Sequence, residues 1–262
     1  MNKPQDRPAI SNRQDQILEL IRTHGFVPIE SLAQKFNLTP QTIRRDINYL
    51  ADEGLVQRYH GGAGPSSSVE NVAYSTRQIL CPEEKKKIGQ LLATHIPNNA
   101  SLFINIGTTT EQVAHALLSH SGLRVITNNL NVANILARKD DFEIIVAGGL
   151  VRNRDRGVIG EAAIDLIGQF KVDFGIIGIS GIDADGTLLD FDYREVRASQ
   201  AILANSRKVY LAADHTKFGR DAMVRMGSIN ALDAIFTDAT PPPAILKKAA
   251  EASVDIFVSE EN

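Results

Sequence analysis

The most informative stretch near the start of this chain is Thr39-Pro-Gln-Thr-Ile-Arg-Arg-Asp-Ile-Asn-Tyr-Leu50. Thr39 is a favourable helix N-cap, and Pro40 suits the first helical position, where a missing N–H costs no hydrogen bond. A helix is therefore expected to begin here. At about 100° per residue, its apolar side chains share one stripe that should face a core. These side chains are Ile43, Ile47 and Leu50.

The remaining side chains of this expected helix are polar and should point outward. Arg can bind guanine through two hydrogen bonds, Asn and Gln can bind adenine, and Thr, Tyr or a second Arg can hold phosphates. By angle, Gln41, Arg45 and Asn48 lie opposite the apolar stripe and are assigned to bases. The full set of predicted DNA contacts on this helix is Thr39, Gln41, Thr42, Arg44, Arg45, Asn48 and Tyr49. By itself, the stretch fits a solvated surface helix better than a DNA-recognition helix. The neighbouring segments therefore decide between the two.

That context is a set of short helices followed by a hairpin. The apolar residues of two upstream helices are Ile17, Leu18, Leu20 and Ile21, then Ile29, Leu32, Ala33 and Phe36. Only residues 37–38 separate the second helix from Thr39, which is the short turn of a helix-turn-helix. Residues 55–60 predict a strand and Gly61-Gly62 a turn, so a wing is expected. Arg58 and His60 at its edge could contact phosphate or a minor groove; the alternative is an exposed hairpin.

Composition sets broad limits on the class of protein. The chain has 262 residues, of which 43% are hydrophobic, enough for two domains. The net charge is −3, so total charge gives no sign of nucleic-acid binding, and only the placement of the arginines does. No apolar run approaches the ~20 residues of a membrane span and no signal peptide is evident, so we expect a cytoplasmic protein without membrane contact. The one cysteine, Cys81, has no zinc-ligand spacing around it, and we expect neither metal nor cofactor.

Domain organisation follows from the one concentrated Gly/Pro/Ser stretch, residues 61–68. We expect a DNA-binding domain over residues 1–64, a linker over 65–82 and a second domain over 83–262. In the second domain, helix-period segments alternate with near-continuous apolar strands, which predicts a mostly parallel α/β sheet covered on both faces. The expected strands are 100–106, 124–127, 142–147, 172–179, 208–213, 234–237 and 255–258, and the expected helices are 84–96, 111–118, 130–138, 161–170, 194–205 and one from 245.

In such a sheet, ligands bind at the carboxyl ends of the strands. The loop Ile104-Asn-Ile-Gly-Thr-Thr-Thr110 runs from strand to helix and offers donors to an anion, although a Gly turn with a Thr cap would look the same. Lys217 could supply positive charge to a phosphate, with Arg152 as a weaker candidate, while Asp190 and Glu195 could orient hydroxyls or simply be solvated. The full set of expected ligand-site residues is Asn105, Gly107, Thr108, Thr109, Thr110, Asn128, Asn129, Gly148, Gly149, Arg152, Asp190, Glu195 and Lys217.

These motifs carry a resemblance to a known family. Residues 14–62, with Pro40-Gln-Thr-Ile-Arg-Arg-Asp46 and Arg58-Tyr-His-Gly-Gly62, resemble the winged helix of the DeoR family of bacterial repressors. The second domain resembles the same family in Ile106-Gly-Thr-Thr109, Thr127-Asn-Asn129, Ala147-Gly-Gly149 and Lys217-Phe-Gly219. The resemblance implies a transcriptional repressor that binds operator DNA. It also implies a sensor domain related in fold to ribose-5-phosphate isomerase and sugar-phosphate deaminases. A phosphorylated small metabolite, glycerol 3-phosphate, is then the expected effector that relieves repression.

One departure from the family pattern concerns catalysis. Where the family and its isomerase relatives usually place an Asp before the Gly-Thr-Thr loop, this chain has Asn105, whose amide cannot accept a proton. We therefore expect a sensor with no catalytic residue, which binds paired operator half-sites as a homodimer or homotetramer. Two alternatives stay open: a sugar-phosphate isomerase or deaminase with an added DNA-binding module, and a structural DNA-bridging protein.

Overall fold

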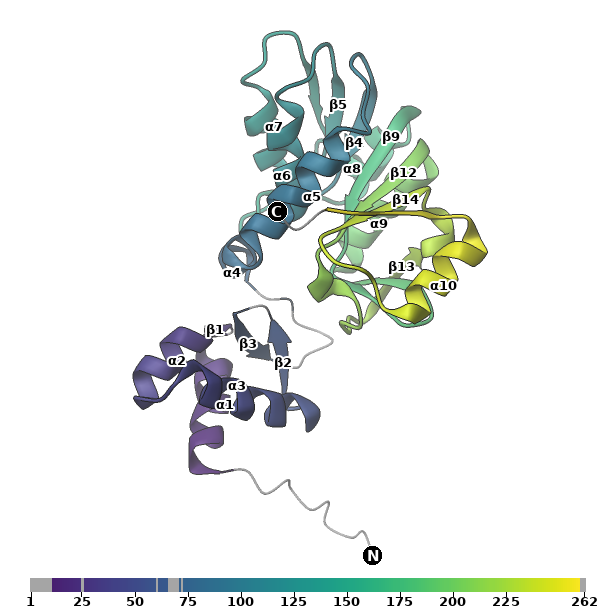
Figure 1. Cartoon of the computed structure of the whole chain (residues 1–262). Coiled ribbons are helices and arrows are strands. Elements are labelled where there is room, and N and C mark those ends of the chain that lie inside the picture. The colour runs from purple at the N-terminus through teal and green to yellow at the C-terminus, as the bar shows by residue number, and fades with distance from the viewer. Residues whose placement is uncertain (1–10, 25, 60, 66–70, 72, 260–262) are drawn as a thin grey trace, which may run out of the picture. The chain divides into compact units, whose positions relative to one another are not determined.

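The computed structural model describes residues 11–24, 26–59, 61–65, 71 and 73–259, and the chain divides into two compact units (Figure 1). The first comprises residues 1–67 and 75–80, and the second comprises residues 68–74 and 81–262.

The first unit contains the helix-turn-helix. Its described elements up to residue 65 are α1 (Asn12–His24), β1 (Val27–Pro28), α2 (Ile29–Phe36), α3 (Pro40–Asp52), β2 (Val56–Tyr59) and β3 (Gly62–Pro65). Asn37 ends α2 in the left-handed conformation, with φ of 53°, and Thr39 then caps α3. The predicted apolar stripe of α3 is buried against α1 and α2. The helix-turn-helix prediction is therefore confirmed.

A small antiparallel sheet, in the order β1-β3-β2, forms the wing. The predicted strand and turn are present, but β2 begins at Val56 and Gly62 already belongs to β3. Gly62 is needed because a Cβ there would lie 2.3 Å from the ring of Phe26. Strand β1 was not predicted, since two residues are too few to show an alternating pattern.

Residues 65–82, predicted as a linker, contain a helix that the sequence analysis missed, α4 (Tyr74–Ile79). Six residues are less than two helical turns, so no apolar period could reveal it. Tyr74 belongs to the second unit, whereas residues 75–80 belong to the first.

The second unit is built on a sheet of seven strands in which every neighbouring pair is parallel. In spatial order they are β15 (Asp255–Val258), β14 (Ala234–Thr237), β12 (Ser206–Ala212), β9 (Val172–Gly178), β4 (Ser101–Ile104), β5 (Arg124–Thr127) and β6 (Glu143–Val146). All seven were predicted, with ends that differ by at most two residues. The predicted parallel α/β fold is confirmed.

Helices cover both faces of this sheet (Figure 1). One apolar layer joins the sheet to α5 (Pro82–Ala93), α6 (Thr108–Leu117) and α7 (Leu130–Leu136), and the other joins it to α8 (Glu161–Ile167), α9 (Tyr193–Ala204) and α10 (Pro243–Ala252). Within β4, Leu102 and Ile104 belong to the first layer and Phe103 to the second. This alternation is the two-residue period of a strand buried on both faces.

The strand order reverses once, between β4 and β9. From β4 the chain adds strands in one direction, through β5 to β6, and from β9 it adds strands in the other, through β12 and β14 to β15. Ligands in open parallel sheets bind in the crevice outside the carboxyl ends of the strands at such a reversal. The fold therefore marks the ends of β4 and β9 as the place to look for a ligand site.

Several short elements follow β6, β9 and β12 in the sequence, and none of them was predicted. They are the hairpin β7 (Leu150–Arg152) and β8 (Gly157–Ile159), the small sheet of β10 (Gly181–Ile182), β11 (Thr187–Asp190) and β13 (Val224–Ser228), and two 3-10 turns, η1 (His215–Lys217) and η2 (Ile229–Ala231). Over the part of the chain that the structure describes, none of the helices combines the length and the apolar character that crossing a membrane requires.

Candidate DNA-binding surface and ligand crevice

Helix α3 presents the polar face that the sequence predicted. The side chains of Gln41, Arg44, Arg45 and Asn48 are exposed, Tyr49 is 37% exposed, and Thr42 is half-buried. Two of the predicted contacts have a structural role: Thr39 Oγ1 accepts from the backbone N of Thr42 and is 3.0 Å from Thr42 Oγ1. These two hydroxyls cap the helix, so the exposed amide and guanidinium groups are left as the stronger candidates for reading bases.

An acidic residue in the middle of α3 fixes this helix on its neighbour, and the sequence analysis did not single it out. Asp46 is buried, and Arg13 of α1 donates to it twice, from Nε at 2.7 Å and from Nη2 at 2.9 Å. Gln14 adds a third donor. Such a bidentate pair fixes orientation as well as distance. Asp46 therefore holds α3 in the rotation that turns its polar face outward.

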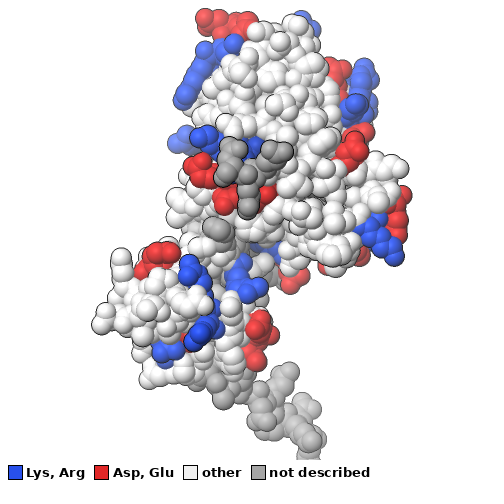
Figure 2. Space-filling view, in the orientation of Figure 1, with Lys and Arg blue, Asp and Glu red and all other residues white. Residues whose placement is uncertain are grey.

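Between α3 and the wing lies a groove of about 430 Å³, lined by Ile29, Glu30, Arg44, Ile47, Asn48, Arg58, Tyr59, Gly61 and Gly62. Across it, Arg58 Nη1 donates to Asn48 Oδ1 at 2.9 Å, so the wing and the helix share one polar surface. Basic side chains gather on the face of the first unit seen in Figure 2. His60, the other predicted wing contact, lies outside the described residues.

At the reversal point of the second unit, α6 begins directly after the end of β4. Thr108 and Thr109 are buried in its first turn, where backbone N–H groups have no acceptor within the helix. Thr110 has a different role, because its Oγ1 donates to the backbone oxygens of Asn105, at 3.0 Å, and Gly107, at 2.9 Å. Thr110 therefore shapes the loop that leads into α6.

Asn105 joins the two strands that flank the reversal. Its Oδ1 accepts from the backbone N of Gly178 at 2.9 Å, and its Nδ2 donates to Ser199 Oγ at 3.2 Å. A carboxylate at this position could accept the first hydrogen bond but could not donate the second. The amide that was expected to meet the ligand is therefore already bonded to protein groups.

The loop after β5 contains two asparagines with different surroundings. Asn129 Oδ1 accepts from the backbone N of Asn131 and of Val132, so it caps α7. Asn128 donates from Nδ2 to the Val158 carbonyl at 3.1 Å. Its Oδ1 is buried and has no hydrogen-bond partner among the described residues. Asn128 is thus the better candidate to accept a hydrogen bond from a ligand hydroxyl.

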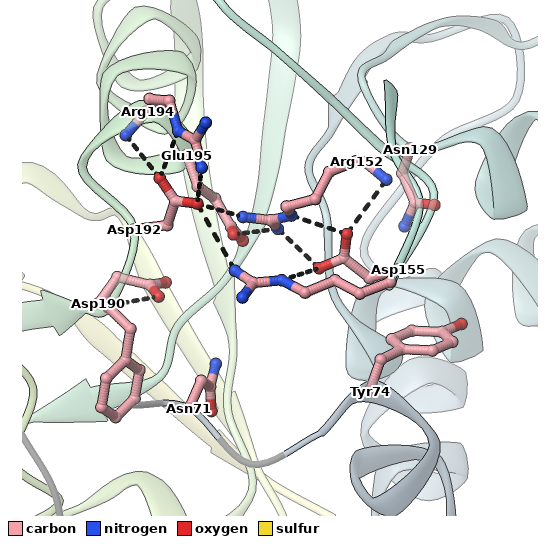
Figure 3. A network of polar contacts seen from close by, with 12 residues as sticks. Asn71, Tyr74, Asn129, Arg152, Asp155, Asp190, Asp192, Arg194 and Glu195 are labelled. Atoms are coloured by element: carbon pink, nitrogen blue, oxygen red, sulfur yellow. Dashed lines mark hydrogen bonds and ion pairs between the residues drawn. The ribbon is translucent and has the colours of Figure 1, made fainter. Parts of the chain in front are cut away.

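Arg152, a predicted ligand contact, is held by three carboxylates (Figure 3). Its side chain is 9% exposed and donates to Asp155 at 2.6 Å, Asp192 at 2.8 Å and Glu195 at 2.5 Å. Burial alone would lower the pKa of Arg152, but the charge of Glu195 and the hydrogen bonds that Arg152 donates to Asp155 and Glu195 raise it. The network joins the β7–β8 hairpin to α9. Arg152 and Glu195, both predicted to contact the ligand, are thus bonded to each other.

Asp190 is likewise bonded to protein groups: its Oδ1 accepts from Ser180 Oγ at 2.9 Å and from the backbone N of Phe191 at 2.7 Å.

The two glycines after β6 have a role in the conformation of the backbone. Gly149 has φ of 143°, and a Cβ there would lie 2.8 Å from the Ile159 carbonyl oxygen. Gly148 and Gly149 are both exposed and lead into the hairpin.

Lys217 follows β12 on η1, and its Nζ lies 3.6 Å from Oδ2 of the buried Asp214. Burial would raise the pKa of Asp214, but the charges of Lys217 and Lys85 lower it. Lys85 is 3% exposed and was not predicted. It shares the buried stripe of α5 with Ile88 and Leu92, so a lysine at apolar helical spacing was the signal that could have revealed it.

Cys81 gives no reactive site, since burial raises the pKa of its thiol to about 12. Within the described ranges, no group of three or more His, Cys, Asp or Glu side chains is placed to hold a metal ion.

Comparisons with known proteins agree with both halves of this description. Residues 13–69 match the DeoR-like helix-turn-helix domain, and residues 81–239 match the DeoR C-terminal sensor domain. The glycerol-3-phosphate regulon repressor of Escherichia coli K12 is 53% identical over 246 residues, covering 94% of this chain and 98% of that protein. The protein of the same name from Haemophilus influenzae is 49% identical, covering 88% and 90%. Ribose 5-phosphate isomerase A from Neisseria gonorrhoeae aligns with a TM-score of 0.37 at 15% identity, over 51% of this chain and 52% of that one, a likeness too low to carry a conclusion.

Proposed function

We propose that this chain, which belongs to the DeoR family of helix-turn-helix transcriptional repressors, represses glycerol-3-phosphate metabolism genes and leaves its operator when it binds glycerol 3-phosphate. The two relatives named as glycerol-3-phosphate regulon repressors support the choice of regulon and metabolite. Residues 1–64 bind operator DNA, and residues 83–262 sense the effector and form the oligomer. The protein acts in the cytoplasm as a homodimer or homotetramer, because one helix-turn-helix reads too few bases and paired half-sites double the contacts.

The observation that carries the effector site is the reversal of strand order between β4 and β9. The first-turn N–H groups of Thr108 and Thr109 donate hydrogen bonds to the phosphate there, where the positive end of the α6 dipole favours an anion. On the adjacent strand end, Asn128 Oδ1 accepts from a hydroxyl of the glycerol backbone. Lys217 supplies positive charge from the end of β12. A phosphate ester with neighbouring hydroxyls matches this set of donors and acceptors.

Titration calorimetry with glycerol 3-phosphate tests the site. Thr108→Glu should weaken binding by on the order of tenfold or more, because a carboxylate next to the phosphate repels it. Gln112→Glu is the matched control, since it adds the same charge one turn further along α6, in a groove between α5 and α6. Unchanged affinity of Thr108→Glu would place the effector elsewhere.

We propose further that the second unit does not turn over its ligand. The support is Asn105, an amide whose Oδ1 and Nδ2 both bond to protein groups at the position where a carboxylate base would be needed. Incubation of the full chain with phosphorylated three- to six-carbon sugars should give no isomer or deaminated product. Product formed at a rate proportional to protein concentration would favour the enzyme alternative.

A further inference from the structure

Two residues of the segment between the predicted domains belong to the second unit and contact its crevice. They are Asn71, which stands before α4 in the sequence, and Tyr74, the first residue of α4. Figure 3 shows both side chains together with the polar network around Arg152. The inference drawn from them rests on the proposed function, because it concerns how effector binding reaches the DNA-binding domain.

Asn71 is bonded to the β9 side of the crevice. Its Nδ2 donates to Ser180 Oγ at 3.2 Å, and its Oδ1 accepts from Arg220 Nη2 at 2.9 Å. Arg220 is 2% exposed and also donates to the Ser180 carbonyl, at 3.2 Å. Ser180 stands two residues after β9 and donates to Asp190. Asn71 therefore joins a buried network at the end of one strand that flanks the reversal.

Tyr74 is bonded to the opposite side of the crevice. Its hydroxyl donates to Glu111 Oε2 at 2.7 Å and accepts from Asn131 Nδ2 at 2.9 Å. Glu111 is buried in the first turn of α6, three residues after Thr108. Its Oε1 also accepts from Asn131 at 3.0 Å and from Asn129 at 3.3 Å. Tyr74 is therefore hydrogen-bonded to the first turn of α6.

We propose that Asn71 and Tyr74 are the residues through which effector binding is passed to the linker. A phosphate at the start of α6 lies close to the Glu111 carboxylate, and the like charges repel each other. That repulsion shifts the group to which Tyr74 is bonded, and Asn71 is bonded to Ser180 after β9, the other strand that flanks the reversal. Because both contacts are part of hydrogen-bond networks with few exposed atoms, a shift of one member displaces the others.

The test uses the full chain and glycerol 3-phosphate as the probe. Operator affinity is measured by fluorescence anisotropy with and without saturating glycerol 3-phosphate, and the ratio of the two dissociation constants is the coupling factor. Tyr74→Phe removes only a hydroxyl, so its operator affinity without effector should stay within about threefold of wild type. Its coupling factor should fall toward one, by up to about tenfold, because a hydrogen bond to a charged group is lost. Asn71→Ala should act in the same direction.

Tyr193→Phe is the matched control, because this tyrosine is 61% exposed on α9, where its hydroxyl accepts from Arg197 Nη1. It should keep the wild-type coupling factor. If wild type responds to glycerol 3-phosphate and the double variant Asn71→Ala with Tyr74→Phe responds equally, the inference is overturned while the proposed function stands. If wild type itself neither binds nor responds, the proposed function fails, and the inference fails with it. Equal thermal unfolding midpoints show that the variants are folded.

Discussion

Arg44 and Arg45 are neighbours in the sequence but have different surroundings on α3. Arg44 lines the groove between α3 and the wing, which Arg45 does not line. Arg45→Ala should lower the preference for operator over other DNA by about 1–3 kcal/mol, the scale of one bidentate base contact. Arg44→Ala should weaken binding to all DNA sequences by a similar factor. The salt dependence of the binding constant should fall by the equivalent of about one phosphate contact. Gel-shift titrations at several salt concentrations measure both effects. Full operator preference in Arg45→Ala would show that Arg45 does not read a base.

His215 makes the stability of the second unit depend on pH. Its ring bonds to Asp238, and this contact raises the pKa of His215 against the opposing effect of burial. A raised pKa in the folded state means that the contribution to stability is complete below the unfolded value of about 6.5 and is lost as the pH rises through the folded value. Urea denaturation of wild type should show this decline above about pH 6.5. His215→Gln and Asp238→Asn should each flatten it, and an unchanged slope in both would exclude the pair as its source.

Among the elements, helix α7 begins at a residue that was predicted to bind the ligand and that instead caps the helix, Asn129. Asn129 Oδ1 accepts from two backbone N–H groups of the first turn. Asn129→Ala should cost about 1 kcal/mol from the cap, within the range of about 0.5–2 kcal/mol for a lost N-cap, and it also removes the hydrogen bond that Nδ2 donates to Glu111. Asn129→Ser should restore the capping part of this stability because it keeps a capping oxygen. Chemical denaturation of the three proteins decides the matter, and equal stability of Asn129→Ala would mean that the cap contributes nothing.

The elements that were predicted correctly from the sequence are long enough for their apolar residues to show a helix or strand period. Strand β5 and helix α3 have their own apolar pattern, and in α3 the start is also marked by Thr39 and Pro40. Strand β1 and helix α4 have two and six residues, too few to establish a period. The β7–β8 hairpin is bonded through Arg152 to Asp192, the N-cap residue of α9, which is 40 residues away along the chain. Local sequence carries no information about such a contact.

For the whole molecule, effector and operator binding must be linked in both directions. A coupling of roughly 1–3 kcal/mol would lower operator affinity about 5- to 150-fold, and operator DNA must then weaken effector binding by the same factor. Calorimetry of glycerol 3-phosphate with and without saturating operator measures this. The fragment of residues 1–64 should bind operator weakly and ignore the effector, because it has neither the sensor nor the oligomer contacts. Identical effector affinities in the two titrations would rule out this linkage.

The helix-turn-helix, the parallel sheet and the loops that gather at its carboxyl edge could be predicted from the sequence alone, because they depend on local apolar period, capping residues and glycine turns. The sequence placed Asn128 at that edge, but it could not separate this residue from Asn105, Asn129 and Arg152. That separation depends on which polar atoms find partners on distant segments: Asn105 at Gly178, and Arg152 at Asp192. Only the tertiary structure brings those segments together, since burial makes each polar group take a partner wherever the packed chain supplies one.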